Sequence, residues 1–573
     1  MRDLFASKKP SALLWLVLLF SLVCSPESFT KDGGRQTTER LPKFLPDDPL
    51  WVDPDRLSIP KPKEIQLSQI YDFLENTFAH PGGDRSQRAQ NINTLGEVPD
   101  SSWFTNRIGL HPMTVDEVVR GPNKGSGPDM SSPWAIIRAK SQGITPGFTI
   151  RDGRGEVYFI KFDPLKYPQL ATSTEVISTK FFYAFGYHVP ENYLAFMRRE
   201  QLKIDPKATI TDQDGKKRPM TEADVNTILS KVPKRPDGSI QVVASLRLPG
   251  EPLGPFKYYG TRSDDPNDIF PHEDRRELRG LRVFSAWLNH DDARSINSLD
   301  MYVTEGGRSY VNHYLIDFGS TLGSGSVKPQ SRRAGNAYIL EWGPILKSAV
   351  TLGLAGRPWE HVKYPDYPAV GRFESTFFQP PRWKPEYPNP AFIRMQNVDA
   401  FWATRTIFRF TDEMVRAIVE TGQISDPEAE KYLAETLIRR RDKILRYYLS
   451  QVNPLDEFQL TEGGVTGPAP STPTLNFRNL GLEAGLSNSA SYQYQWFQFD
   501  NGADSSANRA SLKPLGEVQS ASSTSLPVPQ DDSPYLMVRI QTLSPDQVNW
   551  KKSIEVFLRN GSQKSVVGIE REN

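Results

Sequence analysis

The stretch HDDARSIN, His290 to Asn297, together with IDFG, Ile316 to Gly319, decides how this chain is expected to fold. HDDARSIN directly follows residues 273–289, whose apolar side chains recur at the spacing of one helix face. IDFG ends an apolar run, residues 310–316, that is predicted to be a strand. Two polar loops therefore come directly after ordered elements, which can hold their carboxylate and amide groups in place.

A third polar group lies upstream of these loops. Lys161 ends a predicted hairpin, FTIRDGRGEVYFIKF, residues 148–162, which turns at DGRG. Glu175 follows on a helix that is predicted over residues 174–186 and ends at Gly186. A buried lysine needs a partner of opposite charge, and Glu175 can supply it. The order of lysine, glutamate, aspartate, asparagine and aspartate is the one that phosphoryl transfer requires.

On these residues the sequence resembles the atypical protein-kinase-like superfamily, because HDDARSIN aligns without gaps with the kinase catalytic loop. The resemblance implies an α+β, bilobal protein-kinase-like fold with a small β-rich N-lobe and a helical C-lobe. It also implies the use of ATP and of Mg²⁺ or Mn²⁺. In that resemblance His290 is the loop histidine, Asp292 the catalytic aspartate, Arg294 the phosphate-contacting cation, Asn297 and Asp317 the metal ligands, Lys161 and Glu175 the ion pair, and Phe318 and Gly319 the rest of the DFG motif.

The run TEVISTKFFYAFGYHVPENY, residues 174–193, looks most like the HipA-like, phosphatidylinositol 4-kinase and CotH-type branch of that superfamily. Members of this branch share a helix with an early glutamate that ends in a Gly-x-x-Val-Pro turn. One departure is Asp291, which stands where the family commonly has arginine and is a second candidate for the base. Another is that no segment ending in APE follows Gly319.

The glycine-rich loop of the kinase family is also absent, and its nearest substitute is GITPGF, residues 143–148. Gly143 and Gly147 would let backbone N–H groups approach phosphates, with Thr145 as a hydroxyl donor. An ordinary Pro/Gly turn explains the same residues equally well.

Two further loops have expected roles in such a fold. PGEPLGPF, residues 249–256, would be the hinge that meets adenine through backbone groups. TRSDDPND, residues 261–268, is either a substrate contact or a solvated loop, and the solvated loop is favoured. In the predicted helical region 395–451, residues 439–441 are three consecutive arginines, which are expected to form a solvated face.

The composition limits the classes of protein that this chain can belong to. Its 573 residues predict roughly two to four structural units. Lys+Arg number 69 against 68 Asp+Glu, so no overall field favours nucleic acid as a partner. The single cysteine, Cys24, excludes disulfide frameworks and cysteine-ligated zinc sites.

The ends of the chain predict export and additional domains. Residues 13–23 are apolar except for Ser21 and follow a basic start, as in a signal peptide, so a periplasmic or extracellular protein is expected. A membrane anchor and a lipoprotein are less favoured. The predicted units are a signal peptide (1–28), an N-terminal wrapping extension (29–134), an N-lobe with an insertion (135–256), a C-lobe (257–460), a linker (461–475) and a C-terminal all-β, sandwich-like domain (476–573).

Three functions remain after this reasoning. The leading hypothesis is an exported ATP-dependent phosphotransferase that moves the γ-phosphoryl group to a hydroxyl acceptor: a protein, a lipid headgroup, a sugar or a small molecule. The second is a catalytically silent scaffold whose C-terminal β domain contacts the cell envelope. The third keeps the fold but transfers AMP. An envelope protein in which these motifs are fortuitous is a fourth, generic possibility.

Overall fold

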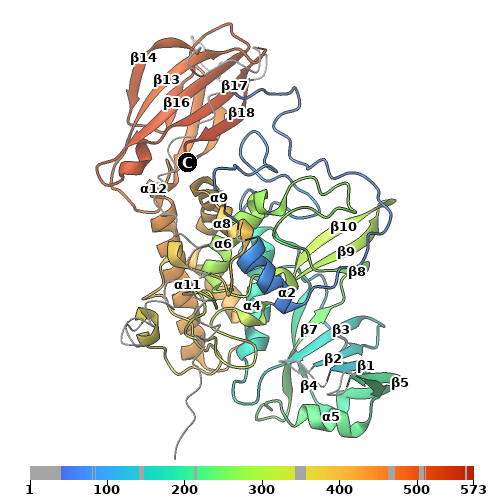
Figure 1. The fold of residues 1–573 in the computed structure, drawn as a ribbon. Coiled ribbons are helices and arrows are strands. Elements are labelled where there is room, and N and C mark those ends of the chain that lie inside the picture. The colour runs from blue at the N-terminus through green and yellow to red at the C-terminus, as the bar shows by residue number, and fades with distance from the viewer. Residues whose placement is uncertain are drawn as a thin grey trace, which may run out of the picture. The chain divides into compact units, whose positions relative to one another are not determined.

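The computed structural model describes residues 41–80, 82–83, 85–140, 147–211, 216–341, 357–461, 472–502, 509, 512–561 and 564–573. Arg40–Asn573 form one compact unit (Figure 1). Helices and several β-sheets are mixed within it, so the predicted α+β class is confirmed. The predicted signal peptide, Gly143 and Thr145 lie outside the described residues.

A seven-stranded sheet carries Lys161. Its order is β4-β7-β3-β2-β1-β5-β6, and its neighbouring strands are antiparallel except for β1 and β5. The predicted hairpin is confirmed, because Gly147 on β2 is paired with Lys161 on β3. Residues 200–240, expected to be an insertion, add two strands and a helix, α5 (Glu222–Leu229), that packs on the sheet. The strands are β1 (Trp134–Lys140), β2 (Gly147–Arg151), β3 (Val157–Phe162), β4 (Asn192–Met197), β5 (Leu202–Thr211), β6 (Lys217–Pro219) and β7 (Ile240–Leu246).

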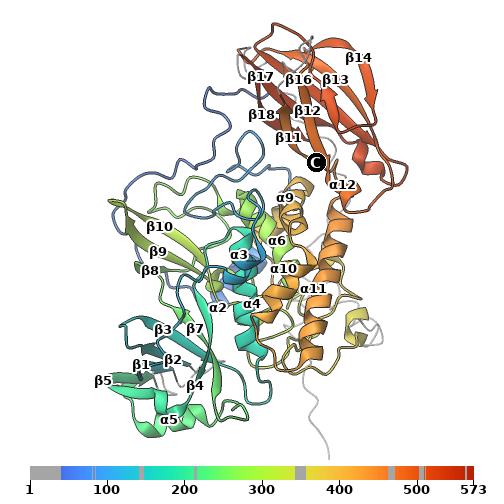
Figure 2. The same cartoon turned by 180° about the vertical axis from the view of Figure 1, so that it is seen from behind.

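The largest apolar core lies between helices. Helix α4 starts four residues earlier than predicted because the Asp163 carboxylate accepts hydrogen bonds from the backbone N–H groups of Ala171 and Thr172. Figure 2 shows α3, α4, α10 and α11 from behind, and α10 contacts the other three. The helices are α3 (Val115–Arg120), α4 (Leu170–Phe185), α6 (Arg276–Leu288), α8 (Pro390–Arg394), α9 (Asn397–Phe408), α10 (Asp412–Glu420) and α11 (Pro427–Tyr448).

A three-stranded sheet places the two motif loops side by side. Strands β9 (Ser298–Glu305) and β10 (Arg308–Leu315) form a hairpin in which Ser298 pairs with Leu315. The third strand, β8 (Glu251–Gly254), comes from the predicted hinge. Its Leu253 carbonyl accepts a hydrogen bond from the backbone of Ile65. The Leu253 carbonyl is therefore not free to meet adenine, which corrects the hinge prediction at this residue.

The C-terminal strands form two sheets that share an apolar core. Strand β11 belongs to the first sheet and precedes the predicted linker, so this all-β region begins earlier in the chain than residue 476. The first sheet contains β11 (Leu455–Thr461), β12 (Thr474–Asn479) and β15 (Ser525–Pro527); the second has the order β14 (Lys513–Ala521), β13 (Ser491–Phe499), β16 (Tyr535–Leu543), β17 (Ile554–Asn560) and β18 (Lys564–Arg571).

The N-terminal extension is tied to this C-terminal region by an aromatic contact. Phe44 packs against Phe499 and Phe557, with ring centroids 5.8 and 5.3 Å away. The side-chain amide of Asn501 accepts from the backbone N–H of Phe44 at 2.7 Å and donates to its carbonyl at 2.8 Å. Residues far apart in the sequence are therefore held together by apolar and backbone contacts.

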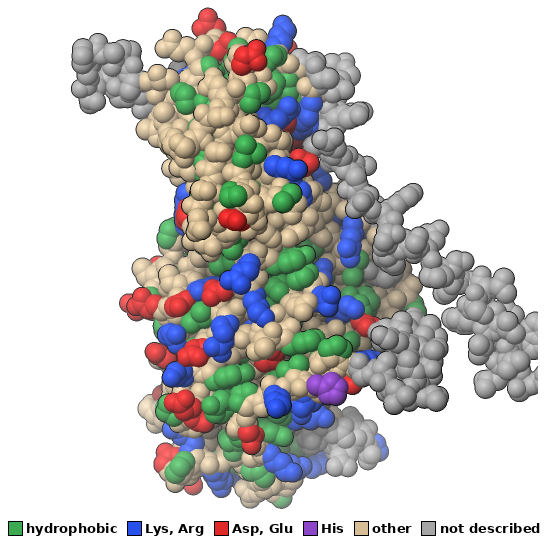
Figure 3. Space-filling model, turned by 90° about the vertical axis from the view of Figure 1, so that its left-hand side faces the viewer, with side chains coloured by type: hydrophobic (Ala, Val, Ile, Leu, Met, Phe, Trp, Pro, Cys, Tyr) green, Lys and Arg blue, Asp and Glu red, His purple; other side chains and the backbone are tan. Residues whose placement is uncertain are grey.

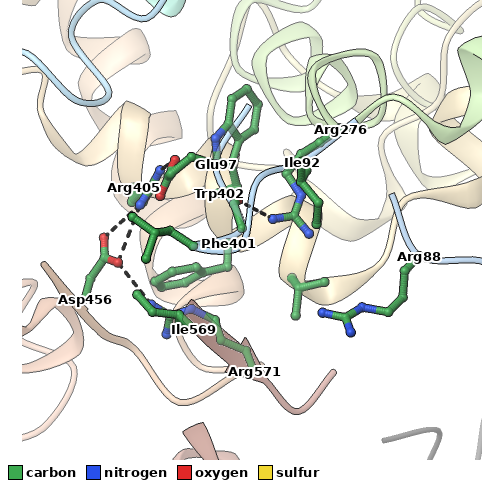
Figure 4. A pocket seen from close by; sticks show the side chains of 13 residues that line it. Arg88, Ile92, Glu97, Arg276, Phe401, Trp402, Arg405, Asp456, Ile569 and Arg571 are labelled. Carbon is green, nitrogen blue, oxygen red and sulfur yellow. Dashed lines mark hydrogen bonds and ion pairs between the residues drawn. The ribbon is translucent and has the colours of Figure 1, made fainter. Parts of the chain in front are cut away.

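Four charged residues, none with more than 12% of its side chain exposed, make a second tie, shown in Figure 4. Arg405 of α9 pairs with Glu97 of the extension and lies 3.3 Å from Asp456 of β11. Arg571 of β18 is 3.0 Å from the same aspartate. We call these four residues the Arg405 cluster. They border a cavity of about 30 Å³, so each charge is balanced by a neighbour in a nearly closed space.

Two sequence predictions about exposure need correction. The loop 261–268 is only partly solvated: Asp264 and three other residues are exposed, but Asp268 is buried between His272 and Arg275, at 2.7 and 3.4 Å. Arg440 of the predicted solvated arginine face is only 3% exposed. Consecutive residues of a helix point about 100° apart, so three adjacent arginines cannot share one exposed face.

Charges of both signs are interspersed over the lower part of the face shown in Figure 3, as the near-zero net charge leads one to expect. The upper part of that face shows few charged side chains. Within the described ranges, none of the helices has both the length and the apolar character needed to span a membrane.

Candidate functional site

Lys161 lies between two carboxylates that come from different parts of the chain. Its Nζ is 3.1 Å from Oε2 of Glu175 on α4 and 2.8 Å from Oδ1 of Asp317, which follows β10. Burial alone would lower the pKa of Lys161, but the two carboxylates together raise it above its usual value. We call these three residues the Lys161 cluster. Its lysine remains a cation throughout the physiological pH range.

The Glu175 carboxylate is fixed from several directions. It is 2% exposed and accepts hydrogen bonds from the backbone N–H of Phe318 at 3.2 Å and from the side-chain amide of Asn192 at 3.5 Å. Burial raises the pKa of Glu175, and the attraction of Lys161 opposes that rise. Glu175 therefore holds both the lysine and the start of the FG turn that follows Asp317.

Asn297 and Asp317 are brought to the same end of the β9–β10 hairpin because they flank its two strands. The backbone N–H of Ile316, the residue before Asp317, donates to the carbonyl of Asn297 at 3.0 Å. The side-chain Nδ2 of Asn297 donates to the carbonyl of Asp292 at 2.8 Å. The amide oxygen of Asn297 is therefore left as an acceptor, and the asparagine links the two motif loops.

The Asp317 side chain is the most accessible carboxylate of the site, with 52% of its surface exposed. Its backbone has φ 63°, in the left-handed region that a non-glycine residue adopts only when its surroundings hold it there. The attraction of Lys161 lowers the pKa of Asp317, and His290 and Arg294 add to this effect. Asp317 is therefore an ionised carboxylate that faces solvent.

Asp292 sits among charged groups of its own loop. Its Oδ1 is 3.0 Å from Nδ1 of His290, and its Oδ2 is 3.9 Å from the Arg294 guanidinium. The His290 contact is close but poorly aligned, and no donor in the described part of the chain makes a hydrogen bond to that Oδ1. Arg294 also pairs with Glu386. Oδ1 is itself buried, whereas the Asp292 side chain as a whole is 15% exposed, so a substrate hydroxyl would have to approach the other oxygen, Oδ2.

Asp291, the second candidate base, makes different contacts. Its Oδ1 accepts from the side-chain amide of Gln330 at 3.0 Å, and its carbonyl accepts from the backbone of Glu386 at 2.6 Å. Burial, reinforced by the negative charge of Asp292, raises the pKa of Asp291 to about 8. At neutral pH Asp291 is mostly protonated, so Asp292 is the better base of the two.

Three aromatic rings in mutual contact support the motif loops. Phe318 stacks on Phe182 of α4 at a centroid distance of 4.6 Å, and His290 lies 5.9 Å from Phe318 and 5.6 Å from Phe182. The sequence reasoning did not single out Phe182. Its position seven residues after Glu175, two helical turns along the same face, was the available signal.

Two other residues of the site were missed. Glu386 pairs with Arg294, and the hydroxyl of Tyr387 donates to the buried carboxylate of Asp72 at 2.5 Å. Asp72 lies on α2 (Gln69–Leu74) of the N-terminal extension, which continues into a π-helical turn, Glu75–Ala79. Glu386 lies 92 positions after Arg294, and Tyr387 lies 315 positions after Asp72. No local sequence pattern links residues at such separations, so these contacts could not be found from spacing.

Of the three residues predicted to contact phosphate in the loop 143–148, Gly147 alone belongs to the described residues. It starts β2 opposite Lys161. A Cβ atom at this position would lie 2.4 Å from the carbonyl oxygen of Ile160, so the close approach of β2 and β3 requires glycine. This explains Gly147 by strand packing and places it beside the cluster.

The donors of the site fit a magnesium or manganese ion. In the described part of the chain no three His, Cys, Asp or Glu side chains gather as a metal site. Asp317 and Asn297 instead supply one ionised carboxylate and one amide oxygen. Such a pair of hard oxygen donors leaves positions for water and phosphate, which is the arrangement that magnesium prefers.

Comparison with known proteins finds no family model and no curated protein that matches the chain. Among solved structures, the chain is similar to the proinflammatory kinase CtkA of Helicobacter pylori, with 13% identity and a TM-score of 0.28 over 53% of this chain and 89% of that one. It is also similar to the Golgi casein kinase, with 11% identity and a TM-score of 0.25 over 70% of this chain and 96% of the kinase. A structure of that kinase with Mn and ADP bound gives the same values.

Proposed function

We propose that this protein is an ATP-dependent phosphotransferase with a bilobal, atypical protein-kinase-like fold of the HipA-like, phosphatidylinositol 4-kinase and CotH-type branch. The observation that carries the proposal is the position of Lys161 between Glu175 and Asp317, at 3.1 and 2.8 Å. Asn297, fixed to the carbonyl of Asp292, links this cluster to the candidate base. Five side chains from four segments thus supply the groups that phosphoryl transfer needs.

In this proposal Lys161 neutralises the α- and β-phosphates of ATP, and Glu175 keeps the lysine in place. Asp292, whose side chain is 15% exposed, accepts the proton of the acceptor hydroxyl through Oδ2, since Oδ1 is buried beside His290. The hydroxyl oxygen forms a bond to the γ-phosphorus, the bond between that phosphorus and the β,γ-bridging oxygen breaks, and ADP leaves. Arg294, 3.9 Å from Asp292, offsets negative charge beside the reacting groups.

Asp317 and Asn297 are the residues that hold Mg²⁺ or Mn²⁺. The ion supplies positive charge to the phosphates. The Lys161 cluster has one cation and two carboxylates, so it carries a net negative charge that a divalent ion can balance. The half-exposed Asp317 is the member of the cluster that faces solvent.

The proposed place of action is outside the cytoplasm. Residues 1–28 would act as a signal peptide, as the apolar run 13–23 suggests. The C-terminal β region would contact the cell envelope, and the acceptor would be a hydroxyl compound rather than a nucleic acid. Free ATP is generally scarce outside the cytoplasm. The proposal therefore requires that the compartment in which the protein acts supplies the nucleotide.

Nucleotide binding is tested by the thermal unfolding midpoint of the full-length protein with and without ATP and Mg²⁺. A ligand that binds the native state alone stabilises it by about 2.7 kcal/mol at a hundredfold excess over Kd. We expect a metal-dependent rise that Asp317→Ala abolishes. Asp442→Ala is a matched control, because the Asp442 side chain is 51% exposed and ion-paired to Arg441, away from the site. A rise that persists in Asp317→Ala would contradict the proposal.

The reaction is tested with ATP labelled at the γ- or the α-phosphate, using cell-envelope extract as a source of acceptors. Transfer of the γ label that Asp292→Asn abolishes is the expected result. Transfer of the α label would indicate AMP transfer on the same site. Binding of ATP without transfer of either label would favour the catalytically silent scaffold.

A further inference from the structure

A second polar cavity lies beside the segment that follows the IDFG motif. Its volume is about 190 Å³, which is larger than the Arg405 cavity of about 30 Å³. It does not contain Lys161, Asp292 or Asp317. We call it the Arg440 cavity; three arginines, one glutamate and several aromatic rings line it, among them Arg372, Arg382, Arg440, Glu374, Trp359 and Trp383.

Arg440 is a buried cation that makes no ion pair with a carboxylate in the described part of the chain. Its guanidinium donates to three backbone carbonyls, those of Trp287, Glu374 and Ala286. It also lies 3.6 Å from the centroid of the Phe378 ring. Burial lowers the pKa of Arg440 to about 9, so it remains charged at neutral pH. A buried charge that no opposite charge balances is costly for a protein to keep.

The other two arginines add to this imbalance. Arg372 donates to the carbonyl of Gln330 at 2.7 Å, and Arg382 is exposed. Among the described residues, no carboxylate lies within 4.0 Å of Arg372, Arg382 or Arg440. Glu374, the acidic residue of the lining, accepts from the backbone N–H of Phe377. The cavity wall therefore carries three positive charges against one negative charge.

The cavity is connected to the catalytic loop by hydrogen bonds. Nε1 of Trp383, a lining residue, donates to the side chain of Asn289 at 2.9 Å. Gln330, whose carbonyl accepts from Arg372, donates through its side-chain amide to Asp291 at 3.0 Å. Both paths end within the three residues before Asp292. A ligand that pulls on Arg372 or Trp383 would shift the loop that carries the candidate base.

From the volume, the excess of arginine and the link to the loop, we infer that the Arg440 cavity is a binding site for a phosphate group and that its occupancy regulates the site at Asp292. Arginine binds phosphate through paired N–H donors, and the space suffices for a phosphate with a small substituent. The phosphate belongs either to a small phosphorylated molecule or to a phosphorylated side chain. This site is separate from the proposed ATP cleft.

The test is calorimetric titration of the full-length protein with inorganic phosphate, with glycerol phosphate and with a phosphoserine peptide, in a buffer without other anions that bind arginine. We expect phosphate and at least one ester to bind with one-to-one stoichiometry. Arg382→Ala should weaken binding at least tenfold. A tighter glycerol phosphate would identify a small molecule as the source, and a tighter peptide would identify a phosphorylated side chain.

Two further variants make the result specific. Arg439→Ala, adjacent on α11 but paired with Glu435, should bind phosphate as the unchanged protein does. Asp317→Ala should also bind phosphate normally, so that a failure of the proposed ATP site is distinguished from a failure of this one. Arg372→Ala provides a second test of the lining if Arg382→Ala is unstable. The inference would be overturned if none of the three probes bound. It would also be overturned if Arg382→Ala and Arg372→Ala both bound phosphate as tightly as the unchanged protein.

Regulation is tested by the release of the γ-phosphate of ATP, measured with and without saturating inorganic phosphate or the tighter ester. We expect the rate to change at least twofold, and Arg382→Ala should remove that change without altering the basal rate. A rate that ligand binding leaves unaltered would disprove the regulatory part. The Trp383→Phe variant, which keeps the ring but loses the hydrogen bond to Asn289, should bind phosphate and lose the response.

Discussion

The Lys161 cluster and the Arg405 cluster use the same kinds of charged side chains in opposite ways. In the Arg405 cluster two arginines face two carboxylates, and none of the four side chains is more than 12% exposed. In the Lys161 cluster one cation faces two carboxylates, and Asp317 is 52% exposed. The first cluster is neutral and closed, whereas the second is negative and open to solvent.

This difference separates a structural role from a binding role. A neutral set of charges with little exposed surface has nothing to gain from a ligand, and its value lies in joining the four chain segments that supply its residues. A set with an excess charge and an accessible member gains from a cation that completes it. The Arg440 cavity has an excess of positive charge, so by the same reasoning it gains from an anion that completes it.

The largest expected effect comes from breaking the Arg405 cluster. Arg405→Met leaves Glu97 and Asp456 buried with fewer cations, and removing one partner of a buried pair costs about 3–5 kcal/mol. We expect urea unfolding to show a loss of that size. Nucleotide binding at a permissive temperature should be unchanged. The exposed pair Arg439–Glu435 supplies the control, since Arg439→Met should cost less than about 1 kcal/mol.

Breaking the Lys161 cluster should have the reverse outcome. Lys161→Met removes the cation that meets the phosphates, and we expect the rate of γ-phosphate release from ATP to fall by about 10²–10³. The loss of stability should be smaller than for Arg405→Met, because the buried Glu175 loses its cation but the half-exposed Asp317 can be hydrated. If Lys161→Met unfolded the protein as readily as Arg405→Met, the distinction between the two clusters would be lost.

The apolar contact of Phe44 offers a third test, of a contact that has a structural role. Phe44 is 3% exposed and packs on Phe499 and Phe557. Phe44→Ala should cost about 2–3 kcal/mol, slightly less than typical core phenylalanines because the extension can relax. Limited proteolysis near residue 48 should become faster. Leu45→Ala is the neighbouring control, since Leu45 is 54% exposed and should cost under about 0.5 kcal/mol.

Elements with strong local signals were predictable from the sequence. The β2–β3 hairpin turns at DGRG, and α4 ends at Gly186, as expected. Some of the residues named for the site also lie in contact: Lys161 with Glu175 and Asp317, and Asn297 with the carbonyl of Asp292. They lie at the ends of one hairpin and on the strand and helix beside it. Local periodicity and a motif in the right order were enough for these features.

Features that depend on distant residues were not predictable. Strand β5 pairs in parallel with β1, and β11 pairs with β12 across the predicted linker. The burial of Arg440 depends on Phe378 and on carbonyls of α6, more than sixty positions away. Sequence patterns describe which face of an element is apolar, but they do not identify the partner that covers it.

The smallest expected effect concerns Asp291, a buried side chain whose carboxyl group is hydrogen-bonded to Gln330. Its pKa is raised to about 8, against 3.8 for an ordinary aspartate. Below pH 3.8 both the folded and the unfolded chain carry the proton. As the pH rises from there towards 8, the unfolded chain loses the proton while the folded chain keeps it, so this residue makes the protein progressively less stable across that window.

Asp291→Asn tests this reasoning because asparagine keeps an oxygen for the Gln330 amide and cannot ionise. We expect the variant to be about 1–2 kcal/mol more stable than the unchanged protein at pH 7, with the gain shrinking towards pH 4. The measurement is urea unfolding of both proteins between pH 4 and pH 8. A gain that is the same at every pH would mean that Asp291 is ionised in the fold. Asp291 would then be a second charge beside Asp292 and could serve as a base.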